Sequence, residues 1–397
     1  MKINWKYLTE TNIGEHWADQ YINFQYIAKE QEEGNLVLPD PGLGDLRYQT
    51  ISGKLRNLLG SSKKIEKTDG SAVSVRILYL SPARESDIPV STIFPDAGWS
   101  WGSAWKKGEG VPVPKKRLNP NTCWRHGSCA RSCIVTAGNM RYNVPSRYCK
   151  TWFWYTQPIV FLRLILSEIA LYSEEAYLSR MLFYPRLNGT SDIMWERYID
   201  MDSLVADLAG LGGFYDYTKW EWTTRVEEGQ EMGIPWPAYY HITFSVDEKR
   251  FSKRWAKKWL EEGYNISMVV STKSQKKALR SQEMKGVVVN GDKTDFRFMD
   301  PPRSIVLLNN KGNLAATEAA MGGSCGSSLS LVRRYSEVEE FADLIRQMNR
   351  DIPIKTPPMK KKPFALRPVR RRKRGEPARR RVKKTSQRAK FANPSRR

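Results

Sequence analysis

The sequence predicts an α/β fold with a mainly parallel sheet, arranged as a partial (β/α) barrel, with an N-terminal extension and a disordered basic C-terminal tail. Short apolar runs alternate with helical patterns in the middle of the chain, polar residues follow these runs, and positive charge gathers at one end. Alternating strands and helices favour a parallel sheet with right-handed connections. We therefore expect an extension over residues 1–72, an α/β body over residues 73–350 and a tail over residues 351–397.

The N-terminal extension is rich in aromatic residues. Trp17, Tyr21 and Phe24 are spaced by four and then three positions, as on one face of a helix. Such a face usually packs on a core, so we expect the extension to pack against the body.

Seven short runs in the body have the branched and apolar composition of buried strands. Polar residues follow several of them; the second run, for example, is followed by Asn188-Gly189-Thr190-Ser191-Asp192. Functional sites of parallel sheets collect beyond the carboxyl ends of the strands, which is where these polar residues stand. The expected strands cover residues 74–80, 182–187, 213–217, 239–244, 265–270, 286–289 and 305–308.

Three segments of the body show the period of an amphipathic helix. Residues 158–180 begin with a proline, which suits a first helical turn, and carry apolar residues at i, i+4, i+8 and i+11. Residues 249–262 place aromatic side chains on one face and stop at a glycine. Residues 336–350 begin with Ser336, which can cap the helix together with Glu339 three positions later.

The positive charge of the chain is concentrated in the tail. The 397 residues contain 65 Lys and Arg against 42 Asp and Glu, a net charge of +23. Residues 355–397 hold 19 of these basic residues and one acid, so the tail carries +18 and the rest of the chain +5. Dense like charges bind polyanions by counterion release, and nucleic acid, DNA or RNA, is the expected partner of residues 355–397. The densest basic blocks are Arg370, Arg371, Arg372, Lys373, Arg374, Arg379, Arg380, Arg381, Lys383 and Lys384. A tail that is merely solvated, or one bound to an anionic membrane surface, is the alternative.

Composition and motifs narrow the classes of protein further. Hydrophobic residues make up 40% of the chain and 14 residues are Trp, enough for a packed core. No run approaches the roughly 18 apolar residues of a membrane span, and the first residues lack the apolar segment of a signal peptide, so we expect a cytosolic protein without membrane association. Phosphate-binding loops, serine-hydrolase elbows and dinucleotide-binding loops are absent from the sequence.

The cysteines suggest a metal site. Cys123, Cys129 and Cys133 follow the spacing C-x5-C-x3-C, and closely spaced thiolates can converge on one metal ion or cluster. Three cysteines with one open position favour a [4Fe-4S] cluster with an exchangeable iron, whereas His126 or Cys149 as a fourth ligand would favour a closed zinc site. Small buried cysteines in a turn are the alternative.

Six ordered segments resemble a family of bacteriophage proteins related to the group named after the mycobacteriophage gene-eighty-eight product. The resemblance extends over about residues 76–312 and implies a phage origin, a shared fold and a location in the host cytoplasm. The family has no settled biochemical function. The segments are RILYLSPARESD (76–87), CWRHGSCARSCIVTAG (123–138), PRLNGTSDIMWE (185–196), FYDYTK (214–219), YHITFSVDE (240–248) and VVVNGDKTDFRFMDP (287–301).

Residues 75–192 also resemble the beginning of the partial barrel of radical S-adenosylmethionine enzymes: a strand, a loop with three cysteines, a helix, and a strand that ends in a polar turn. The spacing departs from the usual C-x3-C-x2-C of those enzymes. By this analogy the three cysteines would hold a [4Fe-4S] cluster that binds S-adenosylmethionine. Seven polar residues would line the site: Asn188, Thr190, Asp192, Asp216, Lys219, His241 and Asp247. Each has a structural alternative, such as helix capping by Asp192 or Asp247 and a tight turn at Asn188.

Three functional hypotheses follow from these observations. The first is a phage iron–sulfur protein, similar to radical S-adenosylmethionine enzymes, which associates with nucleic acid through its tail and modifies it. The second is a non-enzymatic nucleic-acid-binding protein for replication, packaging or host takeover, with a structural zinc. The third is a replication initiator that nicks DNA with Tyr215 or Tyr217, although alternating aromatic residues on a strand usually belong to a core.

Overall fold

The computed structural model describes residues 16–36, 57–60, 72–82, 122–123, 125, 144–247, 252–309 and 333–351. The chain divides into two units, Met1–Leu366 and Arg367–Arg397. All described residues belong to the first unit. The basic blocks of the tail therefore lie outside the described residues, as do Cys129, Cys133 and His126.

The strands form two hydrogen-bonded sheets. The first has the order β1-β2-β3, in which β2 and β3 are parallel and β1 is antiparallel to β2. The second has the order β4-β5-β6-β8-β7, and all its neighbouring strands are parallel. The strands are β1 (Leu59–Gly60), β2 (Val73–Leu78), β3 (Leu182–Arg186), β4 (Phe214–Thr218), β5 (Tyr240–Ser245), β6 (Asn265–Val270), β7 (Val288–Asn290) and β8 (Ile305–Asn309). The prediction of a mainly parallel α/β fold is confirmed.

Among the described residues, one isolated β-bridge joins the two sheets. Phe183 of β3 forms a parallel bridge with Leu211, just before β4: its amide donates to Gly210 (2.7 Å) and its carbonyl accepts from Gly212 (2.8 Å). Beyond this bridge β3 and β4 have no further strand pairing among the described residues. Closure into a partial barrel is thus not confirmed.

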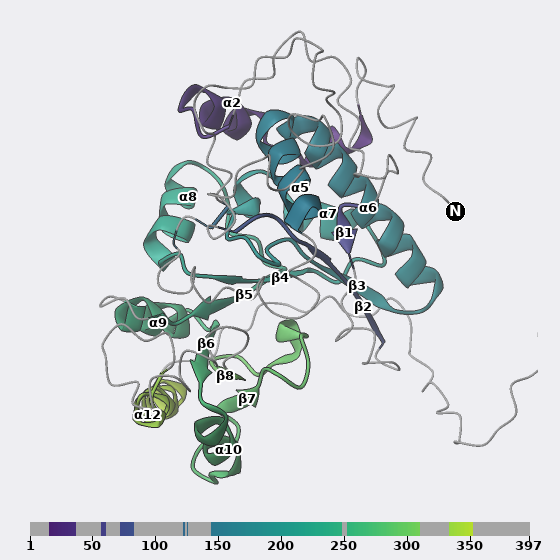
Figure 1. The fold of residues 1–397 in the computed structure, drawn as a ribbon. Helices are drawn as coiled ribbons and strands as arrows, with labels where there is room; N and C mark the ends of the chain where they lie inside the picture. Colours follow the sequence, from purple (N-terminus) through teal and green to yellow (C-terminus); the bar gives the residue numbers. More distant parts are fainter. Residues whose placement is uncertain are drawn as a thin grey trace, which may run out of the picture. The chain divides into compact units, whose positions relative to one another are not determined.

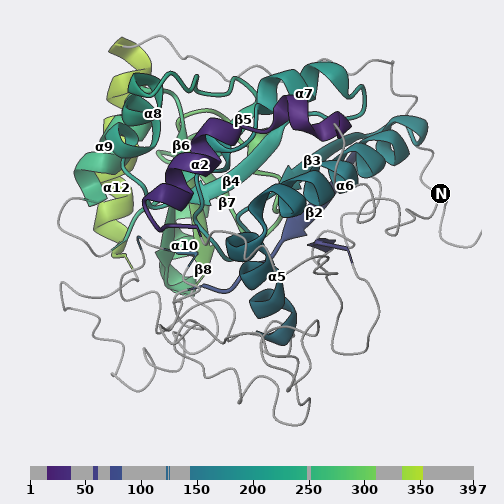
Figure 2. The ribbon, with the colours of Figure 1, turned by 90° about the horizontal axis from the view of Figure 1, so that it is seen from above.

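Most of the helices lie between consecutive strands in the sequence, as the alternating pattern predicts; the first helix precedes all the strands and the last helix follows them. The helices are α2 (Phe24–Glu32), α5 (Val144–Thr156), α6 (Pro158–Leu178), α7 (Met201–Asp207), α8 (Glu228–Glu231), α9 (Ser252–Glu261), α10 (Thr272–Arg280) and α12 (Tyr335–Asp351). Helices α2, α5, α6 and α7 lie on one side of β2–β5 (Figure 1). Helices α9 and α12 lie side by side (Figures 1 and 2) and are joined by an ion pair between Lys253 and Glu340 (2.8 Å).

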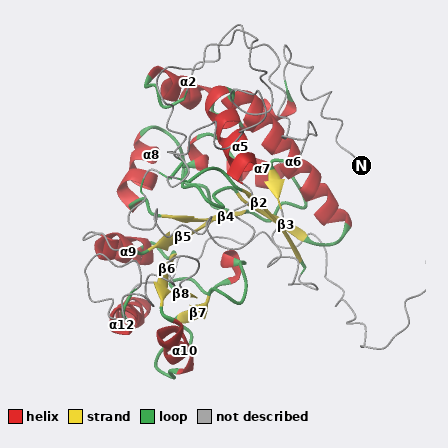
Figure 3. Ribbon diagram, in the orientation of Figure 1, coloured by secondary structure: helices red, strands yellow, loops and turns green. Residues whose placement is uncertain are grey.

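The sheets bury side chains on both faces, because successive residues of a strand point to opposite sides. The face toward the helices carries the larger core, which includes Phe183, Phe214 and Tyr240. The opposite face carries a smaller cluster around the short 3-10 helix η9 (Arg297–Met299), which contacts β4 and β5 (Figure 3). We call it the η9 cluster; its members are Val75, Ile77, Leu182, Tyr184, Tyr215, Phe296 and Phe298.

The described residues of the N-terminal extension pack on the body, but the predicted aromatic face is wrong. Trp17 and Tyr21 belong to the 3-10 helix η1 (Trp17–Tyr21), whereas Phe24 opens α2 after Asn23, whose side chain caps that helix. The break at the cap separates the three side chains: Tyr21 is buried, whereas Trp17 and Phe24 are 41% and 39% exposed.

Polar contacts attach the extension to the body. The Arg163 guanidinium of α6 donates to both carboxylate oxygens of Asp19 (2.7 and 2.6 Å), and the Tyr21 hydroxyl donates to Asp207 (2.7 Å). Among the described residues no helix is long and apolar enough to cross a membrane.

The junction between the sheets requires a glycine at position 212. A Cβ atom there would lie 2.4 Å from Cζ of Tyr184, whose ring packs against the η9 cluster. Overpacking of this kind costs about 1–3 kcal/mol, so we expect Gly212→Ala to lower the free energy of unfolding by that amount in urea titrations. Gly229→Ala, within α8, is the control: outside the backbone of its own helix, the nearest atom to an added Cβ is the Ile234 carbonyl oxygen, 4.0 Å away, so this variant should be neutral or slightly stabilising. Equal losses for both variants would contradict the steric account.

Candidate functional site

A buried carboxylate lies where β3 and β4 separate. Asp216 of β4 is fully buried and accepts hydrogen bonds from the amides of Leu187 (3.3 Å) and Asn188 (2.7 Å), at the end of β3, and from the Tyr240 hydroxyl (2.8 Å) of β5. Burial raises the pKa of Asp216 to about 7, even though the guanidinium of Arg186, 3.9 Å away, and these hydrogen bonds act in the opposite direction.

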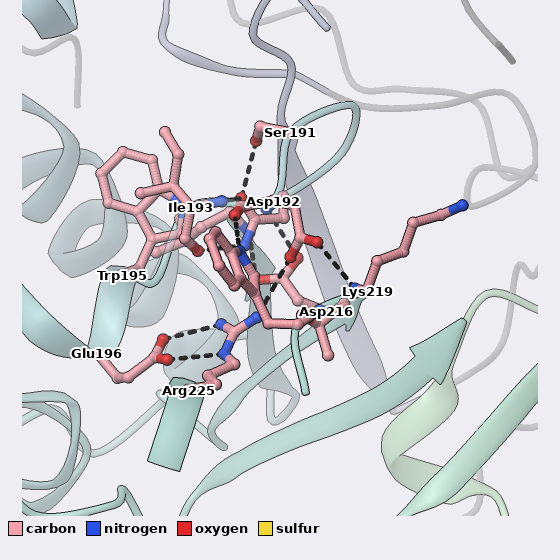
Figure 4. Close-up of polar contacts among 12 residues, drawn as sticks. Ser191, Asp192, Ile193, Trp195, Glu196, Asp216, Lys219 and Arg225 are labelled. Atoms are coloured by element: carbon pink, nitrogen blue, oxygen red, sulfur yellow. Dashed lines mark hydrogen bonds and ion pairs between the residues drawn. The ribbon is translucent and has the colours of Figure 1, made fainter. Parts of the chain in front are cut away.

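The loop after β3 is organised by Asn188. Its side-chain oxygen accepts hydrogen bonds from Ser191 Oγ (2.8 Å), the Ile193 amide (2.9 Å) and Trp195 Nε1 (3.1 Å), and its Nδ2 donates to the Ile193 carbonyl (2.8 Å). Figure 4 shows Ser191, Ile193 and Trp195, the partners in these contacts, beside Asp192. Since both the oxygen and the nitrogen of its side-chain amide bond within the loop, Asn188 acts here as a turn residue that fixes the position of Asp192.

Asp192 connects the ends of several segments. Its carboxylate accepts from the Lys219 amide (2.8 Å), just after β4, and lies 3.4 Å from an Arg225 nitrogen (Figure 4). Its own amide donates to the Thr122 carbonyl (2.8 Å), and its carbonyl accepts from Trp220 Nε1 (2.9 Å). Burial raises the pKa of Asp192, with Arg225 opposing that effect.

Arg225 is the central cation of this region. It lies in a short π-helix, η8 (Thr223–Glu227), and donates two hydrogen bonds to the Glu196 carboxylate (2.7 and 2.8 Å) and one to the Tyr240 hydroxyl (3.2 Å). Nearby negative groups, Glu196 first, raise the pKa of Arg225 despite its burial. Because Tyr240 in turn donates to Asp216, the contacts form one buried polar network: Asp192, Glu196, Asp216, Arg225 and Tyr240.

Four of the predicted site residues gather at the carboxyl ends of β3, β4 and β5. The backbone of Lys219 bonds Asp192, and its ammonium group lies 3.7 Å from the carboxylate of Asp247, which follows β5. Thr190 is also buried there and donates to the backbone carbonyl of Leu80, beyond β2. Asn188 and Asp216 hold the loop after β3 in place: Asp216 accepts from the Asn188 amide, and the Asn188 side chain accepts from the Ile193 amide.

His241 is not part of this group. It is paired in register with Tyr215, and its ring lies near Tyr184 and Phe298 of the η9 cluster, on the face of the sheet opposite Asp216. Desolvation lowers the pKa of His241 to about 4. Tyr215 shares this face and is fully buried, which makes it inaccessible as a nucleophile for DNA nicking.

The cysteine loop begins at the same carboxyl edge. Thr122, which immediately precedes Cys123, donates through Oγ1 to the Ser81 carbonyl (2.8 Å) beyond β2, and its own carbonyl accepts from the Asp192 amide. Cys123 is therefore held next to the loop that follows β3.

A second anchor follows two residues after Cys123. The Arg125 guanidinium lies 3.5 Å from a carboxylate oxygen of Glu221 and 4.5 Å from the ring centre of Trp220, both just after β4. Cys129, Cys133 and Cys325 lie outside the described residues, and Cys149 belongs to α5 without a described side chain. Within the described part of the chain, no three His, Cys, Asp or Glu side chains are grouped to hold a metal ion.

Glu196, Arg225 and Tyr240 were not predicted from the sequence as site residues. Glu196 and Arg225 are separated by 29 residues, so no local spacing connects them. The available signal was indirect: both are charged residues in segments otherwise rich in aromatic side chains, where a charge needs a partner if it is buried.

The raised pKa of Asp216 predicts a pH-dependent stability. Because its folded pKa of about 7 exceeds an unfolded value of about 4, the folded state binds the proton more tightly, and stability is lost as pH rises between these values. We expect the unfolding free energy of wild type to fall more steeply over this window than that of Asp216→Asn, by up to about 1.4 kcal/mol per pH unit. Urea unfolding at several pH values measures the slopes, with Asp343→Asn on the exposed face of α12 as the control for lost charge. Parallel profiles for wild type and Asp216→Asn would refute the assignment.

Comparison with known proteins finds a matching family model. The family model described as Gene product 88 matches residues 96–328, which include the cysteine loop and strands β3 to β8. No curated protein and no solved structure matches the chain. Since the match covers more than half of the chain, including the polar network and the start of the cysteine loop, this protein belongs to the Gene product 88 family of bacteriophage proteins.

Proposed function

We propose that this chain is an iron–sulfur protein, similar in layout to radical S-adenosylmethionine enzymes, which associates with nucleic acid through residues 355–397 in the host cytoplasm and modifies it. The observation that carries the proposal is the anchoring of the cysteine loop. Thr122 and Arg125, on either side of Cys123, bind segments that follow β2, β3 and β4. The carboxyl ends of parallel strands are where functional sites of such sheets form.

The donor set fits a cluster. Cys123, Cys129 and Cys133 offer three soft thiolates from one loop, which would leave one iron open to S-adenosylmethionine. When bound, such a cluster supplies an electron to the molecule at its open iron. Two polar side chains would then lie beside the loop. They are Lys219, whose charge is paired with Asp247, and the buried Asp192.

A structural zinc site is the second candidate, and one observation favours it. The amide of Ser81, whose carbonyl anchors Thr122, donates to Thr151 Oγ1 of α5 (2.7 Å). Helix α5 therefore passes the start of the cysteine loop, and Cys149 lies on that helix two residues before Thr151. A fourth thiolate from α5 would close the coordination sphere, and the protein would then act by binding nucleic acid alone.

The tail supports the nucleic-acid part of the proposal. Its +18 charge follows directly after α12, which ends at Asp351, and only Phe364 and Phe391 could stack on bases. Binding by the tail would therefore depend on phosphate charge rather than on base sequence.

The two metal sites have different spectra. We expect anaerobically purified wild type to show a broad absorption band near about 400 nm, with iron and sulfide, and Cys129→Ala to lose all three because a ligand is removed. Cys325→Ala is the matched control, since it removes a cysteine outside the loop. One zinc per chain without colour would overturn the cluster in favour of the structural site, and a metal-free, colourless protein would refute both.

Deletion of the tail tests whether nucleic acid binds there. Removing residues 355–397 leaves every described element in place, and we expect it to abolish most salt-sensitive retention on DNA. Each phosphate contact contributes about −0.9 to the slope of log K against log salt, so the slope should collapse. A tail with every Arg changed to Lys keeps the charge and should keep the slope. Unchanged retention on DNA after the deletion would contradict the proposal that the tail binds nucleic acid.

A further inference from the structure

A cavity adjoins the polar network on the side of the N-terminal extension. It has a volume of about 270 Å³ and is bounded by α2, α5, the loop after β3 and the residues after β4. Asp192 contributes to its wall and also bonds the residue before Cys123. The cavity therefore opens beside the start of the cysteine loop.

Five flat aromatic side chains line the cavity: Tyr26, Trp154, Tyr155, Tyr198 and Trp220. Their rings are held in place. Trp154 packs edge-on against Tyr198 (centroids 5.0 Å apart), as does Tyr26 (4.9 Å), and Trp220 is fixed by its hydrogen bond to the Asp192 carbonyl. A rigid aromatic wall of this kind suits a planar ring, because stacking requires no rearrangement.

The polar groups of the cavity can bind the edge of a heterocycle. Arg197 is 8% exposed; its terminal nitrogens donate to the Thr224 carbonyl and the Tyr26 hydroxyl, and its Nε has no hydrogen-bond partner among the described residues. Glu30 accepts one hydrogen bond, from the Tyr198 hydroxyl (3.3 Å), and a carboxylate can accept more. An unused buried donor and a nearby acceptor match the mixed donor and acceptor edge of a nucleobase.

The charges of the cavity do not favour phosphate. Glu30 and Asp192 line it together with the cation Arg197, and the Asp192 carboxylate is also paired with Arg225, so the lining offers no excess of positive charge. A neutral ring needs no such charge, whereas a phosphate group does. We propose that this cavity binds one unstacked nucleobase of a nucleic acid and holds it beside the cysteine loop. The proposal rests on the proposed function only for the delivery of the nucleic acid; base binding itself needs neither the tail nor a metal.

Neutral nucleosides test the cavity separately from the tail, because they carry no phosphate. We expect the full chain to bind at least one of adenosine, guanosine, cytidine, uridine and thymidine saturably, with quenching of tryptophan fluorescence. Stacking contributes about 1–3 kcal/mol per base, so Trp220→Leu should weaken binding roughly tenfold or more. Trp17→Leu removes an exposed tryptophan outside the cavity and should leave affinity unchanged. The chain without residues 355–397 should bind nucleosides as wild type does.

Three results would overturn the proposal: no saturable binding up to about 10 mM of any nucleoside, equal affinities for Trp220→Leu and wild type, or equal losses for Trp220→Leu and Trp17→Leu. If Trp220→Leu does not fold, photocrosslinking of wild type to an oligonucleotide with 4-thiouridine decides. Crosslinks at residues 154–155 or 220 support the cavity, and crosslinks confined to the tail refute it. Nucleoside binding by a colourless, metal-free preparation would refute the metal site while the base cavity stands.

Discussion

Beyond the bridge at Phe183, strands β3 and β4 separate, and the buried amides at the end of β3 need an acceptor that the neighbouring strand no longer offers. Asp216 supplies it, with hydrogen bonds from Leu187 and Asn188 to one carboxylate. An unpaired buried amide costs about 1–3 kcal/mol, so this side chain decides where the loop after β3 begins. The positions of Asn188, Asp192 and the anchor of the cysteine loop all follow from that starting point.

A buried carboxylate is costly unless a cation lies nearby, and Arg225 is the cation that serves the buried carboxylates of this region. Asp192, Glu196 and Asp216 are all buried, and the guanidinium contacts the first two directly and the third through the Tyr240 hydroxyl. Loss of one partner of a buried ion pair typically costs 3–5 kcal/mol, whereas the intact pair adds little net stability. The network therefore fixes geometry more than it stabilises the fold. Burial raises the pKa of Asp216, and the nearby cations Arg186 and Arg225 offset that effect only in part.

The sequence predicts most strands well because buried parallel strands are continuous apolar runs; residues 265–270 are predicted and found with the same bounds. It also predicts that Asp192, Lys219 and Asp247 meet, since the carboxyl ends of parallel strands share one edge. His241 was grouped with them wrongly in space, because it lies second in β5 and alternation turns it to the other face. Helices α5, α7 and α10 were not predicted, and the pairing of Glu196 with Arg225 escaped prediction because 29 residues separate the two.

The backbone of Asp192 connects the two parts of the site. Its amide bonds Thr122, at the start of the cysteine loop, and its carbonyl bonds the indole of Trp220, in the wall of the aromatic cavity. Arg125, beyond Cys123, packs on the same indole. If a ring stacks on Trp220, as we propose, it would stabilise the conformation that positions Cys123, and a metal bound by the cysteine loop would stabilise the cavity wall. Thermodynamic linkage would make these two effects equal in size, so that a metal would change the affinity for a base by the same factor as a base changes the affinity for the metal.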